Sequence, residues 1–351
     1  MIITIKEYSK EYTDQCAELL QHLWKEDEKD RIERFNWTYN ECPNYNRPLS
    51  VIAVNENNEV MGFRGYFINK FLLNQNQYLV AQIADTVVSP KARRMGIFQK
   101  MNMFSISLLE QNNISFILNT GPSWPTYYGN KKIGFKDLSH FHSLYKFSAY
   151  NMAYEKIFKH SRTEWNNRDS IKIKDKHREV VLSKRVDDNI LNQLAELNIQ
   201  DKIVSSLDFE NIKWRIKRPN RNYIFAYSVG HNNKLTSFIM LGTKDYYNYN
   251  IGFTLIKNKD DLKRVFKIFR KKYKPASVAI WDFAIDKLTS KTLKKIGFIK
   301  IPFINRIRKN PPALIRTLKT KNDGSLDWYI DGIDIQNIDN WRINKIDQDS
   351  F

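Results

Sequence analysis

The stretch over residues 78–101 constrains the fold of this chain more than any other segment. Residues 78–88 are mainly β-branched and apolar and show no helical stripe, which predicts a largely buried strand. Pro90 cannot donate to a sheet and disfavours helix at the residue before it, so the strand is expected to end there. Gly96 permits a close backbone approach, and Ile97 begins an apolar stripe of helical spacing. The segment is therefore predicted to be a strand, a short basic turn and a helix.

The turn between this strand and helix has the properties of an anion site. Backbone N–H groups at a helix start have no partner within the helix, and the helix dipole places partial positive charge there. Such a nest suits a phosphate. Arg93 and Arg94 add charge to the turn, although a solvated surface turn explains two arginines equally well.

Val88-Ser89-Pro90, followed by Arg93-x-x-Gly96-Ile97-Phe98, resembles the acyl-CoA loop of the GNAT acetyltransferase superfamily. The loop of that family reads Gln/Arg-x-x-Gly-x-Gly/Ala and grips the CoA pyrophosphate through main-chain N–H groups. This chain departs from the pattern at Phe98, where the family has a small residue. The resemblance implies that acetyl-CoA, as acyl donor, is bound by Val87, Val88, Arg93, Arg94, Met95, Gly96, Ile97, Phe98 and Asn119.

Two later segments extend the resemblance in the family's order. Residues 116–120 look like the next strand, and Lys131-Lys-Ile-Gly134-Phe135 resembles the ending of the family's next helix. The match then covers about residues 50–147.

Composition predicts a folded cytoplasmic protein. The chain has 351 residues, enough for two domains, and 42% of them are hydrophobic, which excludes a disordered chain. No apolar run approaches the roughly 18 residues of a membrane span, and the first residues lack the layout of a signal peptide. Cys16 and Cys42 are the only cysteines, so neither a disulfide framework nor a cysteine metal cluster is expected.

The net charge of +19 is concentrated in the second part of the chain. Residues 1–150 hold 17 Lys or Arg against 15 Asp or Glu, which leaves 40 of the 57 basic and 23 of the 38 acidic residues for the remainder. The excess indicates an anionic partner, such as a nucleotide-linked substrate, an RNA or a membrane surface. A solvated surface in a Lys- and Asn-rich proteome explains it equally well.

The second half repeats the outline of the first. Trp37 followed by Pro48 and a strand corresponds to Trp214 followed by Pro219 and a strand, at an offset of 177 residues for the tryptophans. Lys294-Lys-Ile-Gly297-Phe298 repeats the earlier pentapeptide, where the offset is 163 residues. The second copy has therefore lost residues between these points.

The second copy also lacks the loop. Residues 257–261 hold no Arg-x-x-Gly motif, so this copy is not expected to bind CoA. The predicted fold is α/β, with two tandem GNAT-like domains, each a mixed, mostly antiparallel twisted sheet flanked by helices. Residues 1–150 form the catalytic domain, 151–200 connect, and 201–351 form a degenerate domain that contributes to the acceptor site.

Acetyl transfer to an amine needs a polarised thioester carbonyl and a group that removes a proton from the amine. The resemblance implies that Val87 and Val88 occupy the part of the central strand whose backbone N–H groups face the thioester. Asp85 is the only acid on that strand, and a carboxylate in an apolar run is costly without a function, so it is the candidate base. The alternative is a strand-end Asp that bonds a neighbouring turn.

The candidate acid for the leaving thiolate is Tyr128. The family places a Tyr four residues before the Gly of the Gly-Phe ending, but here that position is Asn130. A shifted turn would bring Tyr128 there, although tyrosines in such places more often pack in a core. Since a thiol pKa is near 8.5, release without an acid is an open alternative.

The predicted acceptor-binding residues are Trp124, Tyr127 and His142. His140 and His142 are two apart on an expected strand, which resembles half a metal site, but no third ligand has suitable spacing, so no metal is expected. Ordinary packing within a strand is the favoured interpretation of both histidines, and a groove-lining position or an auxiliary base is the alternative.

These features predict an acetyl-CoA-dependent N-acetyltransferase that acts by direct transfer to a primary amine. The expected acceptor is a small anionic molecule, such as a nucleotide-linked amino sugar or surface-polysaccharide precursor. One alternative is a peptidoglycan-type aminoacyl-transferase that uses aminoacyl-tRNA, since a basic half suits RNA. Another is a non-catalytic module that binds CoA or nucleic acid.

Overall fold

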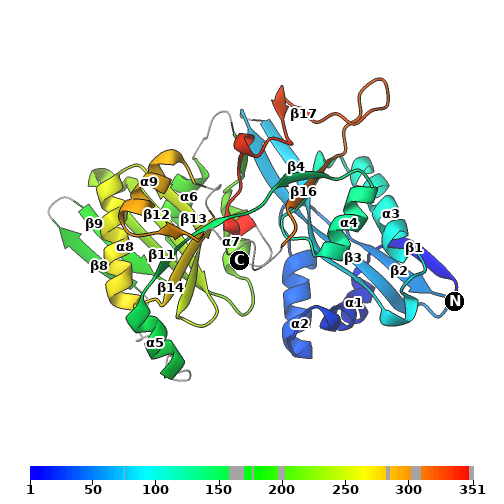
Figure 1. Ribbon diagram of the computed structural model, residues 1–351, viewed down its shortest axis with the longest axis horizontal. Helices are drawn as coiled ribbons and strands as arrows, with labels where there is room; N and C mark the ends of the chain where they lie inside the picture. The colour runs from blue at the N-terminus through cyan, green and yellow to red at the C-terminus, as the bar shows by residue number, and fades with distance from the viewer. Residues whose placement is uncertain are drawn as a thin grey trace.

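The computed structural model describes residues 1–74, 76–157, 170–175, 178–196, 202–281, 285–301 and 310–347. In this part of the chain two large β-sheets lie side by side, each with helices on both faces (Figure 1). The architecture confirms the predicted α/β fold with two GNAT-like sheet domains. Among the described residues, none of the helices combines the length and the apolarity that a membrane crossing requires.

The first sheet has the strand order β1-β2-β3-β4-β5-β16-β6 among the described residues. Its strands are β1 (Ile3–Glu7), β2 (Val51–Asn55), β3 (Val60–Leu73), β4 (Asn76–Val88), β5 (Phe116–Asn119), β6 (Lys136–Ser139) and β16 (Ala313–Thr317). All neighbours are antiparallel except β4 and β5, which are parallel.

Two helical layers cover this sheet. On one face lie α1 (Thr13–Leu19), α2 (Glu28–Phe35) and the π-helical turn η3 (Asn36–Asn40), whose apolar side chains pack on β2 and β3. On the other face lie α3 (Ile97–Gln111) and α4 (Trp124–Lys132). The predicted stripe of α3 is buried at Ile97, Met101 and Leu108. This burial fixes the orientation of the basic turn that precedes α3.

The second sheet has the order β15-β7-β14-β13-β12-β11-β9-β8 among the described residues. Its strands are β7 (Ser143–Phe147), β8 (Ser170–Asp175), β9 (Arg178–Ser183), β11 (Asn222–Val229), β12 (Leu235–Thr243), β13 (Asn248–Ile256), β14 (Ser277–Trp281) and β15 (Ile299–Lys300). Here α8 (Lys259–Tyr273) and α9 (Lys287–Lys295) cover one face, and α6 (Asp188–Ala195) and α7 (Phe209–Ile216) cover the other.

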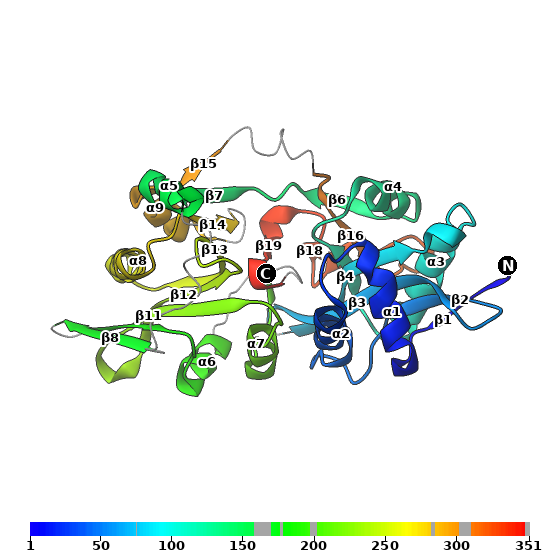
Figure 2. The ribbon, with the colours of Figure 1, turned by 90° about the horizontal axis from the view of Figure 1, so that it is seen from below.

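The two sheets exchange one strand each. β7 leaves the first half of the chain and pairs with β14 and β15 of the second sheet, while β16 returns to pair with β5 and β6 of the first. Figure 2 shows β7 running from the second sheet toward β6. The boundary at residue 150 stays a prediction, but the strands of the two sheets interleave across it, and β8 and β9 come from the predicted connecting segment.

Each exchanged strand also caps a helix of the other half. Arg316 on β16 donates from Nη1 to the carbonyl of Ile133 at 2.8 Å, just after α4. Lys146 on β7 donates to the carbonyl of Ile296 at 2.5 Å, just after α9. Cations at the negative ends of these helices are stabilising.

The contact between Trp37 and Trp214 at the centre of the molecule is also reciprocal, so the two halves are related by an approximate two-fold axis. The indole rings of Trp37 and Trp214 stack with centroids 5.0 Å apart. Each indole N–H donates to the other residue's carbonyl oxygen at 2.8 Å. The two tryptophans are the pair that the repeat predicts, so the repeat is confirmed.

The chain after β16 returns to the first sheet. β10 (Ile203–Ser205) pairs with both β3 and β19 (Trp341–Arg342). The ring of Trp341 packs edge-on against Phe71 and Phe116. This tail covers a face of the first sheet, whereas the related face of the second sheet borders a cavity described below.

Candidate active site

A β-bulge and a strand divergence create the centre of the candidate site. The register of β3 and β4 shifts so that Ala84 and Asp85 together oppose Gly65. The parallel pairing of β4 with β5 extends only as far as Gln82, opposite Leu118. Beyond these positions no described strand pairs with the β5 side of β4, which leaves backbone groups available to a ligand.

The turn that follows β4 has the geometry of an anion nest. After η4 (Pro90–Ala92), Arg94 and Gly96 adopt φ values of +67° and +72°, and Gly96 begins α3. Among the described residues no side chain caps this helix start, and its first turn carries no acid. Residues 93–96 are exposed, and a Cβ on Gly96 would meet nothing within 4 Å. The N-terminus of a fifteen-residue helix is therefore open to an anion.

Phe98, the departure from the family pattern, packs between α3 and α4. Its ring occupies the space where a Cβ on Gly129 would overlap it. The ring centroid lies 5.9 Å from the guanidinium carbon of Arg64. The large residue on α3 is therefore accommodated by a glycine on α4.

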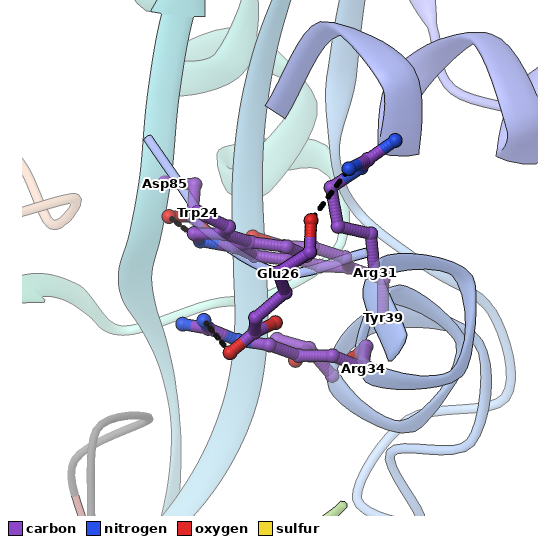
Figure 3. Close-up of polar contacts among 7 residues, drawn as sticks. Trp24, Glu26, Arg31, Arg34, Tyr39 and Asp85 are labelled. Atoms are coloured by element: carbon purple, nitrogen blue, oxygen red, sulfur yellow. Dashed lines mark hydrogen bonds and ion pairs between the residues drawn. The ribbon is translucent and has the colours of Figure 1, made fainter. Parts of the chain in front are cut away.

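Asp85 lies on the opposite face of the sheet, toward α1 and α2. Figure 3 shows the carboxylate with the side chains that surround it. Trp24 donates from Nε1 to Oδ1 at 3.0 Å, and Tyr39 donates from its hydroxyl to Oδ2 at 2.6 Å. These bonds stabilise a carboxylate whose residue is only 8% exposed. Gly65 makes the arrangement possible, because a Cβ there would overlap the Tyr39 ring.

The aromatic side chains of α4 lie at its surface. Trp124 and Tyr128 stack at 5.6 Å and are 42% and 59% exposed. The Tyr127 hydroxyl donates to Asp137 at 3.1 Å, and burial together with this carboxylate raises the pKa of Tyr127. Asp85 and Tyr128 are therefore on opposite sides of the sheet, and the buried position near the bulge belongs to Asn130.

A cavity of about 660 Å³ lies between the two halves. Thr120, at the end of β5, is on its rim, while alternate residues of β7 and β14 form a wall. His140 and Phe141 line it, whereas His142 is not among the described lining residues. The two histidines lie in the connection between β6 and β7, not on a strand as predicted. No group of three His, Cys, Asp or Glu in the described ranges could hold a metal ion.

Buried amide groups connect the cavity to the diverging strands. Gln82 donates from Nε2 to the Thr120 hydroxyl at 3.1 Å and accepts from Asn69 at 2.9 Å. Arg215 of α7 donates to Asn69 at 2.9 Å. Sequence reasoning missed these residues, although Gln82 is detectable as a polar residue within an apolar strand. No spacing in the sequence points to Arg215.

Asn119 lies where the resemblance places it. It is the last residue of β5, and its Oδ1 accepts from the N–H of Gly121 at 3.3 Å. Its buried Nδ2 has no hydrogen-bond partner among the described residues, so it retains donor capacity beside the strand divergence.

Comparison with known proteins agrees with this geometry. The family model described as an acetyltransferase (GNAT) domain matches residues 4–135. The span contains the bulge, the anion nest and the Gly-Phe ending of α4. A search among curated proteins found no significant match.

Several solved structures share the fold of nearly the whole chain. A probable N-acyltransferase from Enterococcus faecalis has a TM-score of 0.63 and 11% identity, covering 91% of this chain and 73% of its own. A GCN5-related N-acetyltransferase from Anabaena variabilis has a TM-score of 0.62 and 10% identity, with the same coverage. A tandem GNAT protein from the clavulanic acid biosynthesis pathway has a TM-score of 0.51 and 10% identity, covering 92% of this chain and 100% of its own.

Proposed function

We propose that this chain, whose residues 4–135 match a GNAT acetyltransferase domain, transfers an acetyl group from acetyl-CoA to the primary amine of a small anionic acceptor. The observation that carries the proposal is the exposed, uncapped N-terminus of α3 at Gly96. Residues 93–97 would hold the CoA pyrophosphate through main-chain N–H groups, with Arg93 and Arg94 beside them.

The acyl group would then reach the divergence of β4 and β5. The unpaired N–H groups beyond Gln82 would polarise the thioester carbonyl, and Asn119 would bond the pantetheine arm. The neutral amine attacks the carbonyl carbon directly, without a covalent enzyme intermediate. Polarisation of the carbonyl is thus assigned to backbone N–H groups of β4 and does not depend on a side chain.

Asp85 is the proposed proton acceptor. Asp85 lies three residues beyond Gln82 on β4, which is about 10 Å along the strand. Its side chain is on the face of the sheet that α1 and α2 cover. Tyr39 and Trp24 hold its carboxylate in place, so the amine proton would reach it directly or through a water.

The cavity between the halves is the proposed acceptor site. Its wall includes the aromatic rings of Tyr145 and Trp281, while Asn248 and Asn250 supply amides. Lys345 also lines it and donates to Asn250. Aromatic faces with amides and one cation suit a hydroxylated ring that carries an anionic group.

The test is a reaction of the purified protein with acetyl-CoA and a panel of amines, which includes nucleotide-linked amino sugars. Mass spectrometry is expected to show one acceptor that gains an acetyl group and releases free CoA. Absence of acetylation across the panel, in a protein that also fails to bind CoA, would end the proposal. Binding of CoA without transfer would favour the non-catalytic alternative.

A further inference from the structure

Arg64 of β3 is a fully buried arginine without an acidic partner. Its exposed fraction is 0%, and no carboxylate among the described residues lies within ion-pair distance. Its guanidinium donates from Nε to the Tyr66 hydroxyl at 3.0 Å, from Nη1 to the Thr86 hydroxyl, and from Nη2 to Asn130 Oδ1 at 3.3 Å. All three acceptors are neutral. A buried charge with only neutral partners is costly, so its retention needs a reason.

Asn130 adds a second donor at the same place. It is 0% exposed, and its Nδ2 has no hydrogen-bond partner among the described residues. The Oδ1 of Asn130 already accepts from Arg64, so its Nδ2 is the atom with hydrogen-bonding capacity left for a ligand. A cation and an unused N–H donor therefore meet between β3, β4 and α4. Both groups favour an anion.

The second half shows that the fold does not need these residues. Arg64 pairs with Thr86 across the bulged strands, and the matching pair in the second sheet is Ile239 with Thr254. Asn130, whose carbonyl accepts from the N–H groups of residues 133 and 135, matches Leu293, whose carbonyl accepts from those of residues 296 and 298. Ile239 and Leu293 are buried in one apolar core cluster. The same architecture is thus built with aliphatic side chains at both positions.

We propose that Arg64, assisted by Asn130, stabilises the negative charge that develops on the sulfur of CoA as it leaves. The inference rests on the proposed function. The amine nitrogen forms a bond to the carbonyl carbon, the carbon–sulfur bond breaks, and its electron pair stays on sulfur. The amine proton passes to Asp85, and water later protonates the thiolate. Arg64 is then a catalytic residue, because its guanidinium contacts the leaving group.

The position of Arg64 favours the sulfur over the phosphates. Arg64 directly precedes Gly65, which opposes the bulge that carries Asp85. Its side chain lies toward α4, whereas the Asp85 carboxylate lies toward α1 and α2. The proton acceptor and the cation are therefore at the same level of the sheet, on opposite faces. The phosphate nest is exposed at residues 93–96, whereas Arg64 is buried.

The experiment compares Arg64→Met and Arg64→Lys with the wild type, with Arg316→Met as the control. Arg316 is a half-buried arginine whose guanidinium donates to the carbonyl of Ile133 at the end of α4. Arg64→Met is expected to lower kcat by about 100-fold, in the range of other groups that stabilise developing charge, with an unchanged Kd for acetyl-CoA, which has no thiol to ionise. Arg64→Lys should recover part of the loss, and Arg316→Met should keep kcat.

A second readout needs no acceptor and separates this inference from the proposed function. The thiolate absorbance of bound CoA is titrated with pH. In the wild type the thiol pKa is expected below its ordinary value of about 8.5, and in Arg64→Met it should return to it. If Arg64→Met keeps both kcat and the lowered thiol pKa, the inference is wrong while the transferase proposal stands. Weaker CoA binding with unchanged kcat would assign Arg64 to a phosphate and also overturn it.

If Arg64→Met does not fold, Arg64→Lys carries the same test. It keeps the charge but loses the planar fork of donors. We then expect a thiol pKa and a kcat between those of the wild type and of an enzyme without the cation. A lysine variant that equals the wild type in Kd yet raises kcat would contradict the role.

Discussion

The helix starts of α3 and α8 occupy related places in the two halves, but only one can receive an anion. Before α3, Gly96 leaves the first N–H groups uncapped and the first turn has no acid. Before α8, the Asn258 side chain accepts from the N–H groups of Asp260 and Asp261, and these two acids fill the first turn. The second helix start thus satisfies its own donors and repels phosphate.

The strands before these helices, β4 and β13, also share their backbone geometry but differ in their side chains. In both sheets the parallel pairing stops, at Gln82 in β4 and at Asn250 in β13, and a bulge follows. Three residues beyond the stop, β4 carries Asp85 and β13 carries Phe253. The bulge and the divergence are properties of the fold, whereas the candidate chemistry depends on a few side chains and one loop.

The largest expected effect comes from charge at the nest. Gly96→Glu places a carboxylate beside the proposed pyrophosphate and strains a residue whose φ is +72°, so the Kd for CoA should rise by about 100-fold or more. Isothermal titration measures it. Gly96→Asn, which tolerates this backbone without adding charge, is the control for strain, and Lys257→Glu before α8 should leave the Kd unchanged. Equal weakening by the two glutamates would remove the distinction between the halves.

Loss of the carboxylate on β4 should affect turnover but not donor binding. Asp85→Asn keeps the shape and an acceptor for Trp24, and it is expected to lower kcat by about 100-fold, within the usual range for general bases. Steady-state kinetics and CoA titration separate the two quantities. Phe253→Leu alters the matching position of β13 and should leave kcat within about twofold because it only trims a core side chain. An Asp85→Asn enzyme with full kcat would assign this residue to structure.

The exchanged strands should be equally important to both halves. Arg316→Met and Lys146→Met each remove a cation that bonds a helix C-terminus, so each should lower the free energy of unfolding by about 1 kcal/mol. Denaturant titration followed by tryptophan fluorescence measures the loss. If one substitution is silent while the other is costly, the two-fold relation does not extend to the caps.

The last prediction concerns the tail that covers the first sheet and is confined to acidic pH. Burial raises the pKa of Asp347 to about 6, so the native state binds its proton more tightly than the unfolded chain, whose Asp pKa is about 3.9. The stability from this group is fully present below about pH 4 and is lost as pH rises to about 6. Asp347→Asn should therefore flatten the decline of Tm across that window. An unchanged slope would show that Asp347 is not the titrating group.

Local features of the fold were predictable because they depend on neighbouring residues. The apolar run before Pro90 and the stripe from Ile97 specify β4 and α3 through periodicity, and Gly96 specifies the turn through its φ. The repeat was visible because Trp37 and Trp214 occupy matching places. The nest is local in the same sense, so the sequence was sufficient to locate it.

The missed features depend on contacts between distant segments. Nothing near β7 or β16 indicates that each strand completes the other sheet, since five-residue strands of ordinary composition do not specify a distant partner. The partners of Asp85 lie 46 and 61 residues away, and the amide chain from Gln82 reaches Arg215 of the other half. The sequence argument placed Tyr128 near the thiolate because of its distance from Gly134 along the chain. In the structure Tyr128 is on the exposed face of α4.

Hydrogen–deuterium exchange with and without acetyl-CoA tests the central claim most directly. We predict that the ligand slows exchange of the backbone N–H groups in residues 93–100 and leaves those of residues 257–262 unchanged, because only the first helix start has free donors. Protection of the second segment, or the same rates at the first segment with saturating ligand, would contradict the account.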